Sequence, residues 1–217
     1  LISNLAPVMF SPATLLRPKL ALSLVGIGWS NTSTFAFHAD ARIGDLAILL
    51  DHAYQGTPAA VVPTGFTQVG TGYSADSTGT RFLASAAKLT TLTPPTGMTG
   101  TSRAKAAIIL RPNRGIVGLT LPTWDVDVSG FSDPTSSISG GGSVDGPLVA
   151  VGYTGSNAAG GATTQTQTPA HGYTEGYDPG SGVRMRVGVT IYNDIGTSHT
   201  VDIGDLNDSN ATAAGYV

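Results

Sequence analysis

Short apolar stretches recur along the chain, and each is bounded by Gly, Pro, Asn or Asp. In Val183–Tyr192 the valines, Met185 and Ile191 fall at the odd positions, whereas Arg184, Arg186 and Thr190 fall at the even ones. A period of two is typical of a β-strand with one buried face. Together with the turn residues, this pattern predicts strands at Lys19–Val25, Thr34–His38, Leu46–Tyr54, Phe66–Tyr73, Arg81–Leu89, Arg103–Leu110, Ile116–Leu121, Leu148–Tyr153, Val183–Tyr192 and Thr200–Ile203.

The stretch Leu46–Leu50 is apolar at every position, so alternation alone does not separate a strand from a helix. Its Leu and Ala content is compatible with a helix. The run is short, however, and directly follows Gly44 and Asp45, which favours a fully buried strand. We interpret Arg81–Leu89 and Ala104–Leu110 in the same way, and Pro63–Thr67 as a turn.

About ten short strands without a strand–helix–strand rhythm predict an all-β protein, an antiparallel β-sandwich that is jelly-roll-like. Residues 19–217 are expected to form a single domain, which is long enough for a proper core. Residues 1–18, with three prolines and no periodicity, predict an extended N-terminal arm. The arm is rich in large apolar side chains, so we expect it to pack on a neighbouring subunit; packing on its own domain is the alternative.

Two longer polar segments, Ser129–Gly146 and Asn157–Ser181, are expected to be loops within the domain. The second is the candidate binding surface, because long loops on a rigid scaffold often carry function and its aromatic residues suit contacts with sugar or protein. Ordinary loop packing is the alternative. The candidate binding residues are Gln165, His171, Tyr173 and Tyr177.

Composition excludes several classes of function. Charged residues make up 12% of the chain, about half the usual share, and the net charge of −3 provides no basic surface for nucleic acid. The absence of cysteine excludes disulfides and thiolate metal sites. No apolar run approaches the ~20 residues of a membrane helix, so membrane insertion is not expected.

No catalytic motif emerges from the spacing of reactive residues. The four histidines show no zinc-binding spacing, and no serine lies in a nucleophile elbow. Asp51 and His52 are neighbours on a predicted strand and therefore face opposite sides. We interpret His52 as an edge or interface histidine. Gly26–Asn31 lacks the third glycine of a dinucleotide loop and is interpreted as a turn between strands.

Two acidic patterns stay open as alternatives. Asp125 and Asp127 share one face of a strand, which suits either a glycosidase carboxylate pair or a solvated face. The segment Asp202–Asn210 is rich in Asp and Asn but fails the EF-hand pattern, because Asn210 and Tyr216 stand where Gly and Glu are needed. Whether calcium binds near Asp202–Asp208 is left open. Apart from these open alternatives, we predict no catalytic residue, no cofactor and no metal site.

The order of several motifs resembles a β-sandwich domain of tailed-phage and prophage virion structural proteins. The resemblance covers roughly residues 20–217, and Phe66 stands where relatives tend to have Trp, a departure that affects packing only. The matching pieces are Gly44-Asp45-Leu46, Pro63–Gly70, Arg81 with Lys88, Ala106–Pro112, the Ser/Gly stretch before Gly146–Ala150, and Asp202–Asp205 with Tyr216-Val217.

This resemblance implies a non-enzymatic virion protein of the fibre, spike, minor tail or head-decoration type, assembled in the host cytoplasm. Its expected partners are other virion proteins and copies of itself, with a trimer favoured, and a host surface glycan is a further expected contact. A Cys-free, weakly charged, Ser/Thr/Gly-rich chain suits such an assembly. The alternative is a carbohydrate-binding module or a glycan-degrading protein on the same scaffold.

Overall fold

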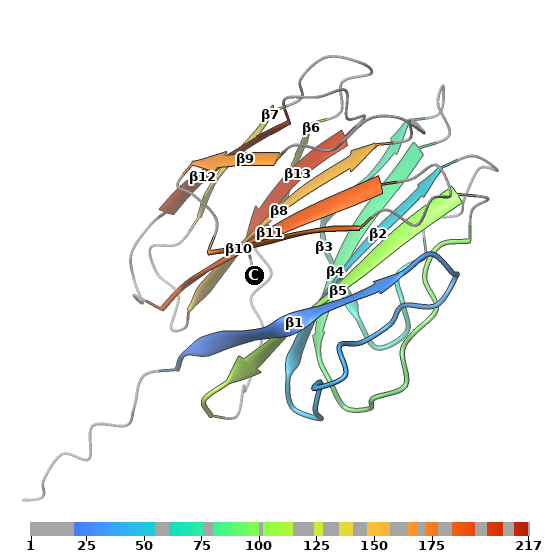
Figure 1. The fold of residues 1–217 in the computed structure, drawn as a ribbon, viewed down its shortest axis with the longest axis vertical. Coiled ribbons are helices and arrows are strands. Elements are labelled where there is room, and N and C mark those ends of the chain that lie inside the picture. The colour runs from blue at the N-terminus through green and yellow to red at the C-terminus, as the bar shows by residue number, and fades with distance from the viewer. Residues whose placement is uncertain are drawn as a thin grey trace, which may run out of the picture.

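The computed structural model describes residues 20–54, 61–75, 80–99, 102–114, 124–127, 135–140, 147–156, 165–168, 172–177, 184–193, 199–205 and 211–216. Within these ranges the chain forms strands and turns and no helix (Figure 1). The predicted arm at residues 1–18 and the predicted strand at Ile116–Leu121 lie outside the described residues.

The first five strands form one antiparallel sheet with the order β1-β5-β2-β4-β3. Strands β2 and β5 therefore lie inside this sheet, and β1 and β3 lie at its edges. The bounds are β1 (Leu22–Ser30), β2 (Leu46–Tyr54), β3 (Thr67–Ala75), β4 (Thr80–Lys88) and β5 (Ser102–Pro112).

The later strands form a second five-stranded sheet, with the order β10-β11-β8-β13-β6, and a three-stranded sheet, with the order β7-β12-β9. The neighbouring strands in both sheets pair in antiparallel fashion. The bounds are β6 (Trp124–Asp127), β7 (Thr135–Gly140), β8 (Leu148–Ser156), β9 (Gln165–Thr168), β10 (Tyr173–Tyr177), β11 (Arg184–Tyr192), β12 (His199–Asp205) and β13 (Ala211–Tyr216).

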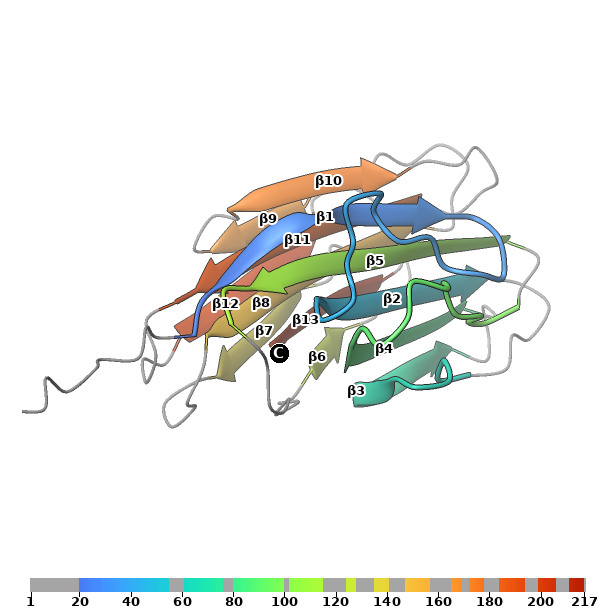
Figure 2. The same ribbon diagram turned by 90° about the horizontal axis from the view of Figure 1, so that it is seen from below.

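The main core lies between the two five-stranded sheets, which form two layers in Figure 2. Ile48 and Ile108 from the first sheet share this core with Val151 and Val187 from the second, and all four are fully buried. The alternation predicted for Val183–Tyr192 is confirmed where side chains are described, since Met185, Val187 and Val189 are buried. The all-β, antiparallel fold is confirmed as well.

The apolar run at Leu46–Leu50 is a strand, because the sheet is covered on both faces at this point. Ile48 and Leu50 enter the core between the sheets. Ala47 and Leu49 enter a second core on the outer face, where Phe35 and other residues of the loops cover the sheet. A strand buried on both faces needs apolar side chains at every position, so it shows no alternation.

The interpretation of Gly26–Asn31 as a turn is wrong, because β1 continues to Ser30 with a bulge between Leu24 and Gly26. The glycines instead make room for the segment after β1. A Cβ atom on Gly28 would lie 2.0 Å from the Ala36 carbonyl oxygen, and one on Gly26 would lie 2.4 Å from the His38 ring. The predicted strand at Thr34–His38 is also wrong, since only Thr34 forms an isolated bridge, to Thr96.

The two predicted loops are wrong in part, because strands lie within them. Strand β7 lies within Ser129–Gly146, and β9 and β10 lie within Asn157–Ser181. Their Ser, Thr, Gln and Gly residues give no apolar alternation, although the backbone pairs as in any other strand. The predicted turn at Pro63–Thr67 is confirmed: Phe66 N donates to Pro63 O at 3.0 Å, and Gly65 has φ 85°.

Candidate functional site

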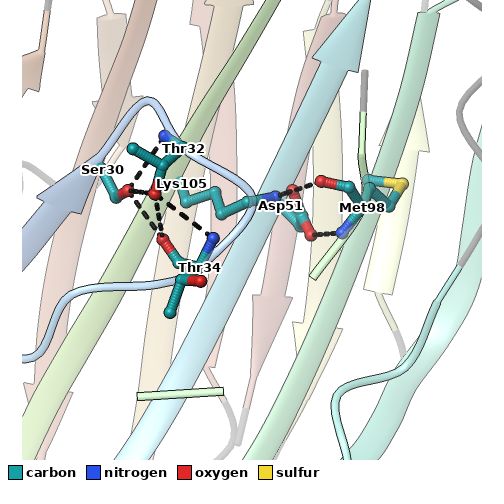
Figure 3. Close-up of polar contacts among 6 residues, drawn as sticks. All are labelled: Ser30, Thr32, Thr34, Asp51, Met98 and Lys105. Carbon is teal, nitrogen blue, oxygen red and sulfur yellow. Dashed lines mark hydrogen bonds and ion pairs between the residues drawn. The ribbon is translucent and has the colours of Figure 1, made fainter. Parts of the chain in front are cut away.

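A buried ion pair crosses the middle of the first sheet. Asp51 on β2 and Lys105 on β5 are direct partners in the strand register, so their side chains share the outer face. Lys105 Nζ donates to Asp51 Oδ1, and the two side chains are 0% and 2% exposed (Figure 3). A charged pair that is this completely desolvated needs further hydrogen bonds to be stable.

The peptide groups of Met98 supply those bonds. Met98 N donates to Asp51 Oδ2 at 2.6 Å, and Lys105 Nζ donates to Met98 O at 3.0 Å. Gly97 permits this approach, because a Cβ atom there would lie 2.1 Å from Asp51 Oδ2. The segment between β4 and β5 is therefore held over the sheet by the ion pair (Figure 3).

A hydroxyl cluster beside Lys105 orders the turn that follows β1 (Figure 3). Ser30, the register partner of Lys105 on β1, donates from Oγ to Thr34 O at 2.7 Å and accepts from Thr32 N at 3.1 Å. This turn leads to Phe35, whose ring centroid lies 5.2 Å from Lys105 Nζ. The aromatic ring thus closes the outer side of the ion pair to solvent.

His52 points to the opposite face from Asp51, as the sequence predicted. Its Nδ1 contacts the hydroxyl of Tyr153 on β8, and the two rings meet edge to face with centroids 5.7 Å apart. The histidine is fully buried in β2, a central strand, so its interpretation as an edge or interface residue is wrong. It joins the two sheets through a polar contact inside the core.

An aromatic seam joins the edge strands of the two large sheets, β1 and β10, which run side by side in Figure 2. The seam consists of Trp29, Tyr173, Glu175 and Tyr177. Trp29 stacks on Tyr177 with centroids 5.2 Å apart and an interplanar angle of 8°. Trp29 Nε1 donates to Glu175 Oε1 at 2.5 Å, and the Tyr173 hydroxyl donates to Glu175 Oε2.

The two tyrosines of the seam have different environments. Tyr177 packs against the main core, and burial raises its pKa. Tyr173 is 39% exposed, and its hydrogen bond to Glu175, with a smaller effect of burial, raises its pKa to about 12. Tyr173 is therefore the seam residue that a partner can reach most directly.

The predicted binding residues are only partly brought together. Tyr173 and Tyr177 share one strand and one face with Glu175 between them. Gln165 begins β9 in the three-stranded sheet, where it pairs with Asp205, and His171 lies outside the described residues. Trp29 was not predicted as a site residue, because nothing in the local pattern around β1 indicates a contact 146 positions along the chain.

A second surface feature surrounds Asp45. Arg111 donates from Nε and Nη2 to the two carboxylate oxygens of Asp45, at 3.0 and 2.9 Å, and this hydrogen bonding raises the pKa of Arg111. Arg42 and Arg114 line the same open hollow of about 290 Å³. Asp45 also accepts from Arg42 N at 2.9 Å, so the Gly44-Asp45 motif forms a capped turn before β2.

The two acidic patterns that the sequence leaves open lie on strands. Asp125 and Asp127 lie on β6, a short edge strand, and Asp202 and Asp205 lie on β12. Among the described residues, no group of three or more His, Asp or Glu side chains is placed to hold a metal ion. The same residues include no helix that is long and apolar enough to cross a membrane.

Comparison with known proteins gives no relative: no protein-family model, no curated protein and no solved structure matches this chain.

Proposed function

We propose that the chain is a non-enzymatic structural protein of a tailed-phage virion, of the fibre, spike, minor tail or head-decoration type. The observation that carries this proposal is that three reactive side chains are buried and make structural contacts. Asp51, His52 and Lys105 are 0–1% exposed and hold sheets and segments together. Groups that no substrate reaches serve the stability of a scaffold, which suits a protein that works by assembling.

The motif order described in the sequence supports the same proposal. Gly44 and Asp45 form the turn before β2, and Pro63–Phe66 forms the turn before β3. Two segments of the phage resemblance are therefore turns that set strand starts. The proposed partners are other virion proteins and further copies of the chain, with a trimer as the proposed state.

The proposal is tested on particles of the phage or prophage that encodes the chain. Purified particles are separated from free protein by density gradient, and the chain is quantified by mass spectrometry against the major capsid protein. We expect a fixed copy number per particle that survives repeated purification. A chain that remains in the soluble fraction, or whose amount varies between preparations, would contradict a structural role in the virion.

A carbohydrate-binding protein is the second candidate, and the aromatic seam favours it. Tyr173 exposes part of its ring beside the Glu175 carboxylate, a combination that suits stacking on a sugar and hydrogen bonding to its hydroxyl groups. If this surface binds glycan, Tyr173→Ala will weaken retention on host polysaccharide, whereas Leu92→Ala, at another exposed apolar residue, will not. Release of reducing sugar by the purified chain would indicate degradation and contradict the non-enzymatic proposal.

A further inference from the structure

We propose that Lys105 and Asp51 form an intramolecular isopeptide bond, a covalent amide between the Nζ atom of Lys105 and the Cγ atom of Asp51. The bond would join the neighbouring strands β5 and β2 of the first sheet. This inference concerns the chemistry of the buried pair and does not depend on the proposed function.

The register places the two reacting groups opposite each other. Asp51 and Lys105 are direct partners in the β2–β5 ladder, and both strands are held by a further neighbour, β4 and β1 respectively. The amine therefore meets the carboxyl group in a fixed geometry, and the contact between Nζ and Oδ1 is direct. Holding two reactants in this way removes most of the entropy cost of bringing them together, and so lowers the barrier to reaction.

Burial favours the reactive protonation states. Lys105 and Asp51 are both buried, with Phe35 over the ammonium group. Desolvation disfavours charged forms, so a proton passes from the Lys105 ammonium to Asp51 Oδ1 along their hydrogen bond. The products of this transfer are a neutral amine, which is nucleophilic, and a carboxylic acid, which can lose water.

The Met98 peptide groups are placed to assist the addition step. Met98 N donates to Asp51 Oδ2 at 2.6 Å, so it stabilises the negative charge that develops on this oxygen when Nζ attacks Cγ. Met98 O accepts a hydrogen bond from Nζ at 3.0 Å and orients the amine. Oδ2, which keeps its donor, becomes the amide oxygen.

The reaction balances without any further reagent. The new bond joins Nζ to Cγ, and the bond between Cγ and Oδ1 breaks. Oδ1 carries the proton that it received first, and it leaves as water with the second proton that Nζ loses. An ammonium and a carboxylate thus become one amide and one water molecule, with no change of oxidation state, and the dry site disfavours the reverse hydrolysis.

The experiment is the mass of the intact, denatured full-length chain, measured after prolonged incubation of the folded protein. We expect the measured mass of the wild type to be lower than the mass calculated from its sequence by one water molecule. Lys105→Arg keeps the positive charge and should have its full sequence mass. Lys88→Arg, at an exposed lysine, is the matched control and should keep the loss of water.

A tryptic digest locates the bond and remains informative if Lys105→Arg fails to fold. The expected product is a branched peptide that joins residues 43–81 to residues 104–114, because a modified Lys105 resists trypsin and the Arg111–Pro112 bond is cleaved poorly. A wild-type chain with its full sequence mass would overturn the proposal. So would loss of water that maps elsewhere, for example to a succinimide at Asp145-Gly146.

Discussion

Lys105 shows how a single residue sets the outer face of the first sheet. Its ammonium group contacts Asp51, the Met98 carbonyl and the face of Phe35, which belong to three different segments. Removing one partner of a buried ion pair leaves the other charge without compensation, and this costs more than the pair itself contributes. The position should therefore be among the most sensitive in the chain.

Lys105→Met keeps much of the side-chain volume and removes the charge. Relative to wild-type chain of full sequence mass, in which the two groups are still an ion pair, we expect it to lower the free energy of unfolding by about 3–5 kcal/mol, because the Asp51 carboxylate is then buried alone. Urea denaturation monitored by circular dichroism measures the change. Lys88→Met, at an exposed position, should stay within about 0.5 kcal/mol of the wild type.

The double variant Asp51→Leu/Lys105→Met separates lost charge from lost packing. It should recover part of the stability, since no unpaired charge remains, although the Met98 peptide groups lose their partners. If the double variant were less stable than Lys105→Met alone, an uncompensated carboxylate could not be the cause of the single variant's loss.

Gly97 is the position where the loop and the ion pair come closest. Gly97→Ala places a methyl group where Asp51 Oδ2 and the Phe35 ring already lie, at 2.1 and 2.7 Å. The overlap forces the 97–98 backbone away from the sheet, so we expect a loss of about 1–3 kcal/mol, typical of overpacking. Thermal unfolding measures the loss.

Gly172→Ala is the matched control for this substitution. A Cβ atom on Gly172 meets only the Val189 carbonyl oxygen, at 3.5 Å, which is an ordinary contact. Equal melting temperatures for the Gly97 and Gly172 variants would mean that the loop moves away at little cost, and that the approach of Met98 to Asp51 is not tightly held.

At the scale of elements, the seam between β1 and β10 depends on pH through Tyr173. Its phenol donates to Glu175, and its pKa is raised from 10.0 to about 12. A group whose pKa is higher in the folded state contributes its full stabilisation below the unfolded value and loses it as the pH rises through the folded value. The contribution of this hydrogen bond should therefore be present below pH 10 and disappear between pH 10 and about 12.

The comparison of wild type with Tyr173→Phe tests this pH dependence. The difference between their unfolding free energies should be largest below pH 10 and shrink between pH 10 and 12. A titration of tyrosinate absorbance should show one late-ionising group in the wild type that the variant lacks. A difference in stability that stays constant across this range would show that the phenolic proton is not part of the seam.

The strands that the sequence predicts well are those whose apolar pattern is local. Strand β2 is predicted with its observed bounds, Leu46–Tyr54, and β11 within one residue. Strands β7, β9 and β10 escape the prediction, because Ser, Thr, Gln and Gly carry no hydrophobic period. Strands β7 and β9 pair with β12, farther along the chain, and a local window contains no information about that pairing. Strand β10 pairs with the next strand, β11.

The same limit explains why the contacts of the candidate site residues were predicted only in part. The opposite orientation of Asp51 and His52 follows from strand geometry alone and is confirmed. The partner of Asp51 is Lys105, 54 positions away, and the partner of Glu175 is Trp29, 146 positions away. Sequence spacing does not give such contacts, since they arise from the order of strands in the two sheets.

At the scale of the whole molecule, the described chain begins at Leu20, just before β1. The first described residues, Leu20 and Ala21, lead into β1. Ala21 N donates a hydrogen bond to Asn113 Oδ1, and Leu22 N donates one to Asn193 Oδ1, which anchors the start of the strand. In the described part of the chain, the core clusters begin at Leu22. Cleavage before these anchoring bonds should therefore leave the interior of the sheets intact.

Deletion of residues 1–16 tests the proposed role of this segment in assembly. We expect the truncated chain to keep the β spectrum and, to within about 1 kcal/mol, the unfolding free energy of the monomer, because it keeps Leu22 and both asparagine contacts. It should fail to oligomerise or to enter particles, because the removed residues include Leu1, Ile2, Leu5, Val8, Met9, Phe10, Leu15 and Leu16. Light scattering after size-exclusion chromatography reports the oligomeric state, and a substitution of Leu5, Val8 and Phe10 by Ser controls for chain length. A truncated chain that no longer folds would mean that the segment packs on its own domain, and a truncated chain that still assembles would place the subunit contacts elsewhere on the sheets.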